Sequence, residues 1–141
     1  MVKIGGEVNP NGLRGRIESA YSVVWLQDTD GIPVGSGALK KPNKNYRLTV
    51  FQKAGSREEP GKYEAELGWV FLRTEFRGQG LSTALMKELL LAAGGKAIYA
   101  TARKNNKTMR AILTKFGFLQ EGKDYPSDEG NYRMVLYIKK A

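Results

Sequence analysis

Two glycines separate a strand-like run from a helix-like run in the middle of this chain. Residues 62–72 read KYEAELGWVFL, an alternating pattern that predicts a strand. Residues 79–93 end at a glycine pair and carry an apolar stripe at helical spacing, which predicts a helix. The members of this stripe are Leu81, Ala84, Leu85, Leu89 and Ala92. The stretch RGQGLS, residues 77–82, spans the junction. Glycine is costly inside regular structure, so the pair predicts backbone that turns tightly or approaches a ligand closely.

The remaining runs predict a mixed α/β fold. We expect short helices at 9–20 and 46–54, a hairpin at 21–40, a strand at 96–101, a second long helix at 105–117, and strands at 118–122 and 132–140. In the helix at 46–54, Val50 and Phe51 should pack inward. Strand–helix–strand segments in a largely antiparallel chain predict a mixed sheet with helices on its faces, and not a doubly wound fold. At 141 residues, we expect residues 1–141 to form a single domain.

Two residue types are missing, and their absence narrows the chemistry. The sequence contains no cysteine, which excludes disulfides and thiolate nucleophiles. It contains no histidine, which excludes a Ser-His-Asp triad and argues against a structural metal site. An enzyme of this composition has to use carboxylates, tyrosines, hydroxyls, lysines and backbone amides.

The chain is basic, with a formal net charge of +9 and a pI near 9.8. Such a charge favours a polyanionic partner, either a phosphorylated ligand or nucleic acid, although it also simply keeps a small protein soluble. No apolar run approaches the ~20 residues of a membrane span, and the N-terminus lacks the apolar stretch of a secretory signal. We therefore expect a cytoplasmic protein with no membrane partner.

The junction 77–82 has the composition of a phosphate site. Helix N-termini expose unpaired N–H groups and bind phosphate well. Gly78 and Gly80 would let the backbone wrap a pyrophosphate, while Arg77 adds charge and Ser82 a hydroxyl donor. The alternative is a tight strand-to-helix turn that needs glycine for its own geometry.

Residues 67–90, LGWVFLRTEFRGQGLSTALMKELL, resemble the acetyl-CoA-binding motif of the GNAT superfamily of N-acetyltransferases. The core of that motif, Q/R-x-x-G-x-G/A, is represented here by its Arg-Gly-x-Gly version at 77–80, whereas the first position of the strict form falls on Glu75. Residues 106–118, NKTMRAILTKFGF, resemble a later helix of the family. The two motifs occur in the expected order.

The resemblance implies a GNAT-like mixed, mostly antiparallel sheet, in which the central parallel strands 62–72 and 96–101 splay apart and helices cover both faces. It also implies direct transfer of an acetyl group from acetyl-CoA to an amine of a small molecule or peptide, with no metal. The missing cysteine agrees with direct transfer. The residues implied to bind acetyl-CoA are Val70, Phe71 and Leu72 for the pantetheine amides, Arg77, Gly78, Gln79, Gly80, Leu81 and Ser82 for the pyrophosphate, and Asn106 for the cofactor arm.

Glu66 matches the position where some family members have their general base, which takes the proton of the amine. The alternative is that Glu64 and Glu66 form a solvated polar face paired with lysines. Leu113 stands where many members have a tyrosine that protonates the CoA thiolate, so the general acid is unassigned. The substitutes considered for it are Tyr99, Tyr125 and Tyr132.

The acceptor amine is not specified by the sequence. Asp124, Asp128 and Glu129, in a loop near the C-terminus, could attract a cationic amine or be ordinary turn residues. Two alternative functions remain open, namely a CoA-binding protein without catalysis and a basic module that binds nucleic acid. We do not favour nucleic acid, because the interleaved aromatics of an RNA-binding sheet are missing. An exposed final strand could pair with a second copy to form a homodimer.

Overall fold

A computed structural model describes residues 2–4 and 20–141, whose contacts divide the chain into two compact units. Unit 1 comprises residues 1–41 and 65–95, and unit 2 comprises residues 42–64 and 96–141. The helix predicted at 9–20 lies almost wholly outside the described residues.

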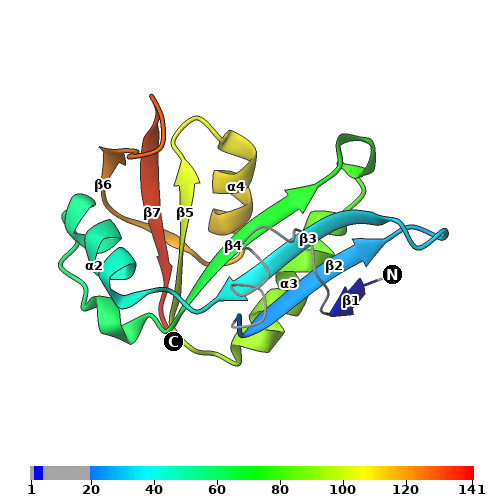
Figure 1. Cartoon of the computed structure of the whole chain (residues 1–141), viewed down its shortest axis with the longest axis horizontal. Coiled ribbons are helices and arrows are strands. Elements are labelled where there is room, and N and C mark those ends of the chain that lie inside the picture. The colour runs from blue at the N-terminus through cyan, green and yellow to red at the C-terminus, as the bar shows by residue number, and fades with distance from the viewer. Residues whose placement is uncertain (1, 5–19) are drawn as a thin grey trace. The chain divides into compact units, whose positions relative to one another are not determined.

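The described residues of unit 1 form an antiparallel sheet with one long helix (Figure 1). The strands pair in chain order: β1 (Val2–Ile4), β2 (Ser22–Gln27), β3 (Pro33–Lys40) and β4 (Ala65–Leu72). The predicted hairpin is confirmed as β2 and β3. Its turn is closed by the carboxylate of Asp28, which accepts hydrogen bonds from the N–H groups of Asp30 and Ile32 at 2.9 and 3.0 Å. The strand predicted from residue 62 begins instead at Ala65, because residues 60–62, starting with a proline, form a 3₁₀ turn.

Helix α3 (Leu81–Ala93) packs on one face of this sheet, with Leu89 against Gly37 of β3. It begins two residues later than predicted and ends, as predicted, at Gly94 in the left-handed conformation. One residue of the predicted apolar stripe is wrong. Ala92 is exposed, whereas Met86 and Ala93 are buried, because the buried stripe follows the positions 85, 89 and 93 at four-residue spacing.

Unit 2 has three strands and two helices. Strand β7 (Arg133–Lys139) lies between β5 (Ile98–Arg103) and β6 (Leu119–Pro126) and runs antiparallel to both. Helices α2 (Lys44–Lys53) and α4 (Lys107–Lys115) complete the unit. Both edges of β7 are therefore paired, so the expectation of an exposed final strand is wrong, and the homodimer stays an untested prediction. Strand β6 is longer than predicted because a register shift between Glu121 and Tyr125 continues it past Gly122.

The core of unit 2 is aromatic. The rings of Tyr63 and Tyr99 each lie 5.4 Å, centroid to centroid, from the ring of Phe51 in α2. The prediction that Val50 and Phe51 pack inward is confirmed, since both are buried. The other buried members of this cluster are Ala54, Tyr125, Leu136 and Ile138.

The predicted mixed α/β class with mostly antiparallel strands is confirmed. Among the helices of the described residues, none combines the length and the apolar character that a membrane span requires.

Candidate active site

Strand β4 is interrupted by a β-bulge at residues 69 and 70, which follows the predicted base and includes Val70, the first of the predicted pantetheine-binding residues. Gly68 lies opposite Ala38 of β3, and Phe71 lies opposite Ser36, so two residues of β4 oppose the single residue between them. The extra residue bends the strand and disrupts its ladder locally. Bulges of this kind change the direction in which a strand presents its backbone and side chains.

Beyond the bulge, alternate residues of β4 present their backbone groups in opposite directions. The N–H of Arg73 donates to the carbonyl of Val34 at 2.8 Å. Because the N–H and C=O groups of successive residues alternate in direction along an antiparallel pair, those of Phe71 point toward β3 and those of Leu72 point away from it. This corrects one of the three predicted backbone partners of the pantetheine arm, since the N–H and C=O of Phe71 serve the β3–β4 ladder. Leu72 remains at the opposite edge of β4, where its carbonyl accepts from Nε of Arg77 at 3.0 Å.

The loop from β4 to α3 is a tight turn held by side chains. A 3₁₀ turn (Thr74–Phe76) leads into Gly78 and Gly80, whose φ angles of +78° and +76° favour glycine. The amide of Gln79 donates to the carbonyl of Glu75 at 3.3 Å. The turn geometry thus requires both glycines, as the alternative interpretation held.

The same loop leaves a group of backbone donors without protein partners. The first hydrogen bond of α3 runs from the N–H of Ala84 to the carbonyl of Gly80, at 3.2 Å. Within the part of the chain that the structure describes, no bond is made by the N–H groups of Gly78, Gln79, Gly80, Leu81 and Ser82. A Cβ at either glycine would meet no atom within 4 Å, so the space in front of the loop is open. Unpaired N–H groups at a helix N-terminus form an anion-binding site.

Glu66 is buried and ion-paired. Its side chain is 5% exposed, and its Oε1 lies 3.3 Å from Nζ of Lys40, the residue directly opposite on β3. Glu64 differs, because it is exposed and pairs with Lys96 at 3.3 Å. Glu64 is therefore a solvated residue paired with a lysine, as the alternative interpretation predicted. Glu66 is also paired with a lysine, but it is buried and not solvated. A buried carboxylate beside an ammonium is held as a charge-compensated pair.

Asn106, the predicted contact to the cofactor arm, caps helix α4 in unit 2. Its Oδ1 accepts from the N–H of Met109 at 3.1 Å, which leaves the side-chain NH₂ as a donor. Leu113 stands where many family members have the tyrosine that protonates the CoA thiolate. It is fully buried, and its side chain has no acidic proton. Of the tyrosines considered as substitutes, Tyr99 and Tyr125 are buried, and Tyr132 lies under the guanidinium of Arg103, 3.9 Å from its ring centroid.

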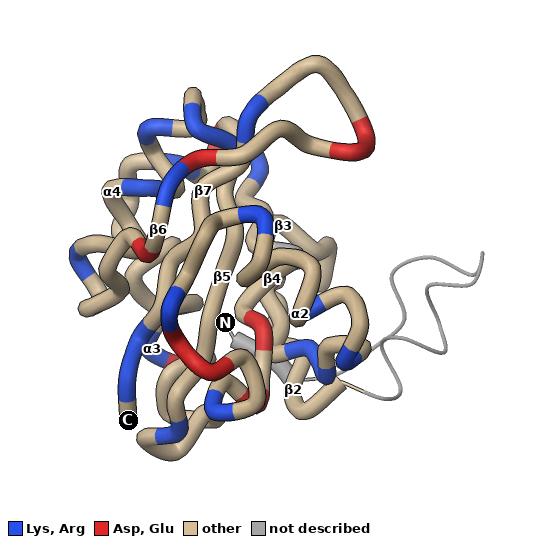
Figure 2. Tube along the Cα trace, turned by 90° about the vertical axis from the view of Figure 1, so that its left-hand side faces the viewer, with Lys and Arg blue, Asp and Glu red and all other residues tan. Residues whose placement is uncertain are grey.

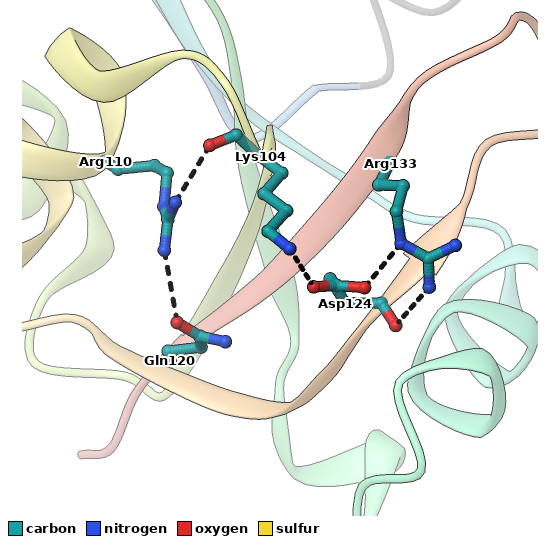
Figure 3. Close-up of polar contacts among 5 residues, drawn as sticks. All are labelled: Lys104, Arg110, Gln120, Asp124 and Arg133. Atoms are coloured by element: carbon teal, nitrogen blue, oxygen red, sulfur yellow. Dashed lines mark hydrogen bonds and ion pairs between the residues drawn. The ribbon is translucent and has the colours of Figure 1, made fainter.

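Arg110 fixes the loop in front of Asn106, a role that the sequence analysis missed. Its guanidinium donates to the Lys104 carbonyl at 2.8 Å, to the Gln120 side chain at 3.3 Å and to the Tyr137 hydroxyl at 2.9 Å. Figure 3 shows the first two of these contacts. One arginine thus joins the β5–α4 loop to β6 and β7. No local pattern identifies it, because its partners lie far apart in the sequence.

Two of the three acidic residues considered for a cationic acceptor already have cationic partners. Asp124 binds Nζ of Lys104 at 2.8 Å and Nε of Arg133 at 2.5 Å (Figure 3). Hydrogen bonds from these two residues hold the pKa of Asp124 below its usual range. Asp128 is paired with Lys53. The two aspartates therefore serve the fold of unit 2.

The positive charge of the protein is concentrated in unit 2 (Figure 2). This unit contains 15 of the 23 Lys and Arg and seven of the 14 Asp and Glu, so it holds eight of the nine net positive charges. An open hollow of about 520 Å³ along α4 is lined by Lys107, Arg110, Ala111, Thr114, Lys115 and Tyr137. Among the described residues, no group of three or more His, Cys, Asp or Glu could hold a metal ion.

Comparisons with known proteins agree with the geometry. The family model described as "Acetyltransferase (GNAT) family" matches residues 10–118. A GNAT family acetyltransferase from Elizabethkingia anophelis, solved with acetyl-CoA bound, has a TM-score of 0.67 and is 11% identical, over 100% of this chain and 97% of its own. The ribosomal-protein-alanine N-acetyltransferase of Brucella melitensis has a TM-score of 0.61 and is 18% identical, over 92% of this chain and 72% of its own.

An acyl-CoA N-acyltransferase from Pseudomonas aeruginosa has a TM-score of 0.57 and is 19% identical, over 84% of this chain and 67% of its own. No curated protein matches the sequence. At these identities the solved structures show a shared fold, while the family model extends over most of the chain. The chain belongs to the acetyltransferase (GNAT) family.

Proposed function

We propose that the protein transfers the acetyl group of acetyl-CoA to an amine of a small molecule or peptide. The observation that carries this proposal is the group of unpaired N–H donors at residues 78–82, which suits a pyrophosphate. The family assignment and the acetyl-CoA in the similar Elizabethkingia structure support the same donor.

Each part of the cofactor has a candidate partner. The loop N–H groups would bind the pyrophosphate, together with the terminal nitrogens of Arg77, whose Nε is held by Leu72. The outward backbone groups of Leu72, with those of Val70 in the bulge, would pair with the pantetheine amides. The side-chain NH₂ of Asn106 would donate to a carbonyl of the arm, because its Oδ1 is committed to the helix cap.

The proposed reaction is a direct displacement. The amine nitrogen attacks the thioester carbon, a C–N bond forms and the C–S bond breaks, while Glu66 takes a proton from the nitrogen, directly or through water. The sulfur leaves as a thiolate and is protonated by water, since Leu113 offers no proton. No acyl-enzyme is required, in agreement with the missing cysteine.

Thermal unfolding with acetyl-CoA tests the cofactor site. At a hundredfold excess over Kd, binding adds about 2.7 kcal/mol and raises the Tm of the parent by roughly a few degrees. In Gly78→Ala, a Cβ enters the space in front of the loop, and the rise should disappear. Gly31→Ala is the matched control, because Gly31 has a similar φ of +79° and no atom within 4 Å of its Cβ position. A parent without any rise, or equal rises in both variants, would contradict the site.

Replacing Glu66 by Gln tests the base. We expect kcat to fall by about 10²–10⁴-fold because proton removal is lost, while the response of Tm to acetyl-CoA persists. The control Glu64→Gln should keep full activity, since Glu64 is exposed. Full turnover in Glu66→Gln would exclude Glu66 as the base. A parent that binds acetyl-CoA and acetylates no amine would instead favour a CoA-binding protein without catalysis.

A further inference from the structure

Glu66 and Lys40 lie on the face of the unit 1 sheet that is opposite α3. Leu89 of α3 contacts Gly37, and the next residues of β3 that share its face are Gly35 and Leu39. Lys40 therefore projects from the other face of β3, together with its cross-strand partner Glu66. The ammonium and the carboxylate, 3.3 Å apart, meet on the face that this helix does not cover.

Gly68 gives Lys40 the room to reach the carboxylate. It lies two residues after Glu66, and a Cβ at this position would stand 2.8 Å from Cε and 3.1 Å from Nζ of Lys40. The lysine stem thus runs along the backbone of β4, over a residue that has no side chain. A side chain at position 68 would require the flexible end of Lys40 to shift.

This pairing changes what the site offers to an acceptor. An unpaired buried carboxylate would attract an alkylammonium ion, whereas a carboxylate compensated by Lys40 does not, and the ammonium repels a second cation. Asp124 and Asp128 are themselves paired with cations, and the whole chain is positively charged. At Glu66 the acceptor therefore meets a carboxylate that Lys40 already compensates.

We propose that Lys40 restricts the acceptor to weakly basic amines that arrive uncharged, such as the α-amino group of a peptide, and disfavours lysine side chains and polyamines. This inference rests on the proposed function and on Glu66 as its base. An α-amino group has a pKa of about 7.7–8.0, so about one molecule in ten is neutral at pH 7. A lysine amine, with a pKa of about 10.4, is neutral in only about one molecule in 2,500.

The proton balance follows from this arrangement. The neutral nitrogen attacks the thioester carbon without losing a proton first, so that the C–N bond forms as the C–S bond breaks. The nitrogen becomes acidic during the attack, and Glu66 then accepts its proton. Lys40 contacts the carboxylate of Glu66 but neither the amine nor the thioester in this scheme, so it acts as a positioning residue that holds the carboxylate in place.

The test compares two matched peptide acceptors between pH 6.5 and 9.5. One peptide has a free α-amino group and no lysine, and the other has a blocked N-terminus and one lysine. For the parent, we expect kcat/KM at pH 7 to favour the α-amine by about 100-fold or more, and kcat/KM for the lysine peptide to rise about tenfold per pH unit. Spermidine should behave as the lysine peptide does.

Two variants connect this preference to Lys40. In Lys40→Met, the preference for the α-amine should fall at least tenfold and the pH dependence for the lysine peptide should flatten. Gly68→Ala should do the same by displacing the flexible end of Lys40, and it keeps the test valid if Lys40→Met does not fold. Lys87→Met, which removes an exposed charge from α3 in the same unit, should retain the preference of the parent.

Two results would overturn the inference alone. The first is a parent that acetylates the lysine peptide or spermidine at pH 7 as fast as the α-amine. The second is an undiminished preference in both Lys40→Met and Gly68→Ala. A parent that acetylates neither peptide contradicts the proposed function itself, and this inference with it.

Discussion

Gly122 shows how strictly a single residue can be constrained by backbone that is distant in sequence. It lies within β6 with a φ of +69°, and a Cβ there would stand 2.1 Å from the carbonyl oxygen of Ala54, at the end of α2. That oxygen accepts a hydrogen bond from the N–H of Lys123 at 2.8 Å. The contact attaches β6 to the end of α2 and has no room for a side chain.

Gly122→Ala should therefore lower the free energy of unfolding by about 2–4 kcal/mol, because the backbone contact has to separate and the positive φ is strained. Gly55→Ala is the control, since Gly55 has a φ of +65° and its nearest neighbour would be 3.8 Å away. It should cost only about 1 kcal/mol. Urea unfolding measures both, and equal losses would show that the contact with Ala54 contributes nothing.

Several single residues could be predicted from the sequence. The burial of Val50 and Phe51 was expected for a short helix at 46–54, and the left-handed Gly94 followed from its place after a helix. The burial of Glu66 could not be predicted, because strand alternation gives the face of a residue but not what covers it. The contribution of Lys40 was missed for the same reason, since cross-strand register is not visible in either strand alone.

At the scale of elements, Asp124 connects three segments of unit 2. It lies on β6 and binds Arg133 of β7 and Lys104 of the β5–α4 loop. Its pKa is lower in the folded protein than the usual value near 3.9. A lowered pKa means that the folded state favours the carboxylate, so the stabilisation is complete above about pH 4 and is lost as the pH falls through the folded value.

Asp124→Asn should accordingly lower the stability at pH 6, and the difference from the parent should shrink as the pH falls below about 4. Unfolding by urea, repeated from pH 6 to pH 2.5, measures this difference. Asp128→Asn should have a smaller effect at every pH, because Asp128 is exposed and an exposed ion pair contributes little. A pH-independent difference for Asp124→Asn would show that packing, not charge, is responsible.

Most elements were predictable, and the boundaries that failed have local physical causes. The start of β4 was displaced by the turn at Pro60, and β6 was underestimated because its register shift interrupts the alternation. The two motifs placed the loop 77–82 and Asn106 on the correct elements. The hydrogen bonds of Arg110 could not be predicted from the sequence, because they depend on how α4 lies against β6 and β7.

At the scale of the whole molecule, charge is distributed unevenly between the units. Unit 2 holds nearly all of the net positive charge, and Lys107 contributes to the hollow along α4. Clustered charge attracts polyanions more strongly than the same charge spread over a surface. Binding to a sulfated polysaccharide should therefore depend on unit 2.

Lys107→Glu should elute from a heparin column at lower salt than Lys87→Glu, although both change the net charge equally. Lys87 is exposed on α3 of unit 1 and serves as the matched control. Equal elution of the two variants would mean that only the total charge matters. The total charge was readable from composition, whereas its distribution required the fold.

The central position of β7 has a consequence for synthesis on the ribosome. Strands β5 and β6 emerge first, but neither pairs with the other, and the strand that joins them follows only at residues 133–139. The strand pairs of unit 2 therefore cannot form until β7 has been synthesised. A nascent chain interrupted before Arg133 would leave unpaired the edges of β5 and β6 that bind β7. Cellular quality control should remove such a product rather than release it as a partly active enzyme.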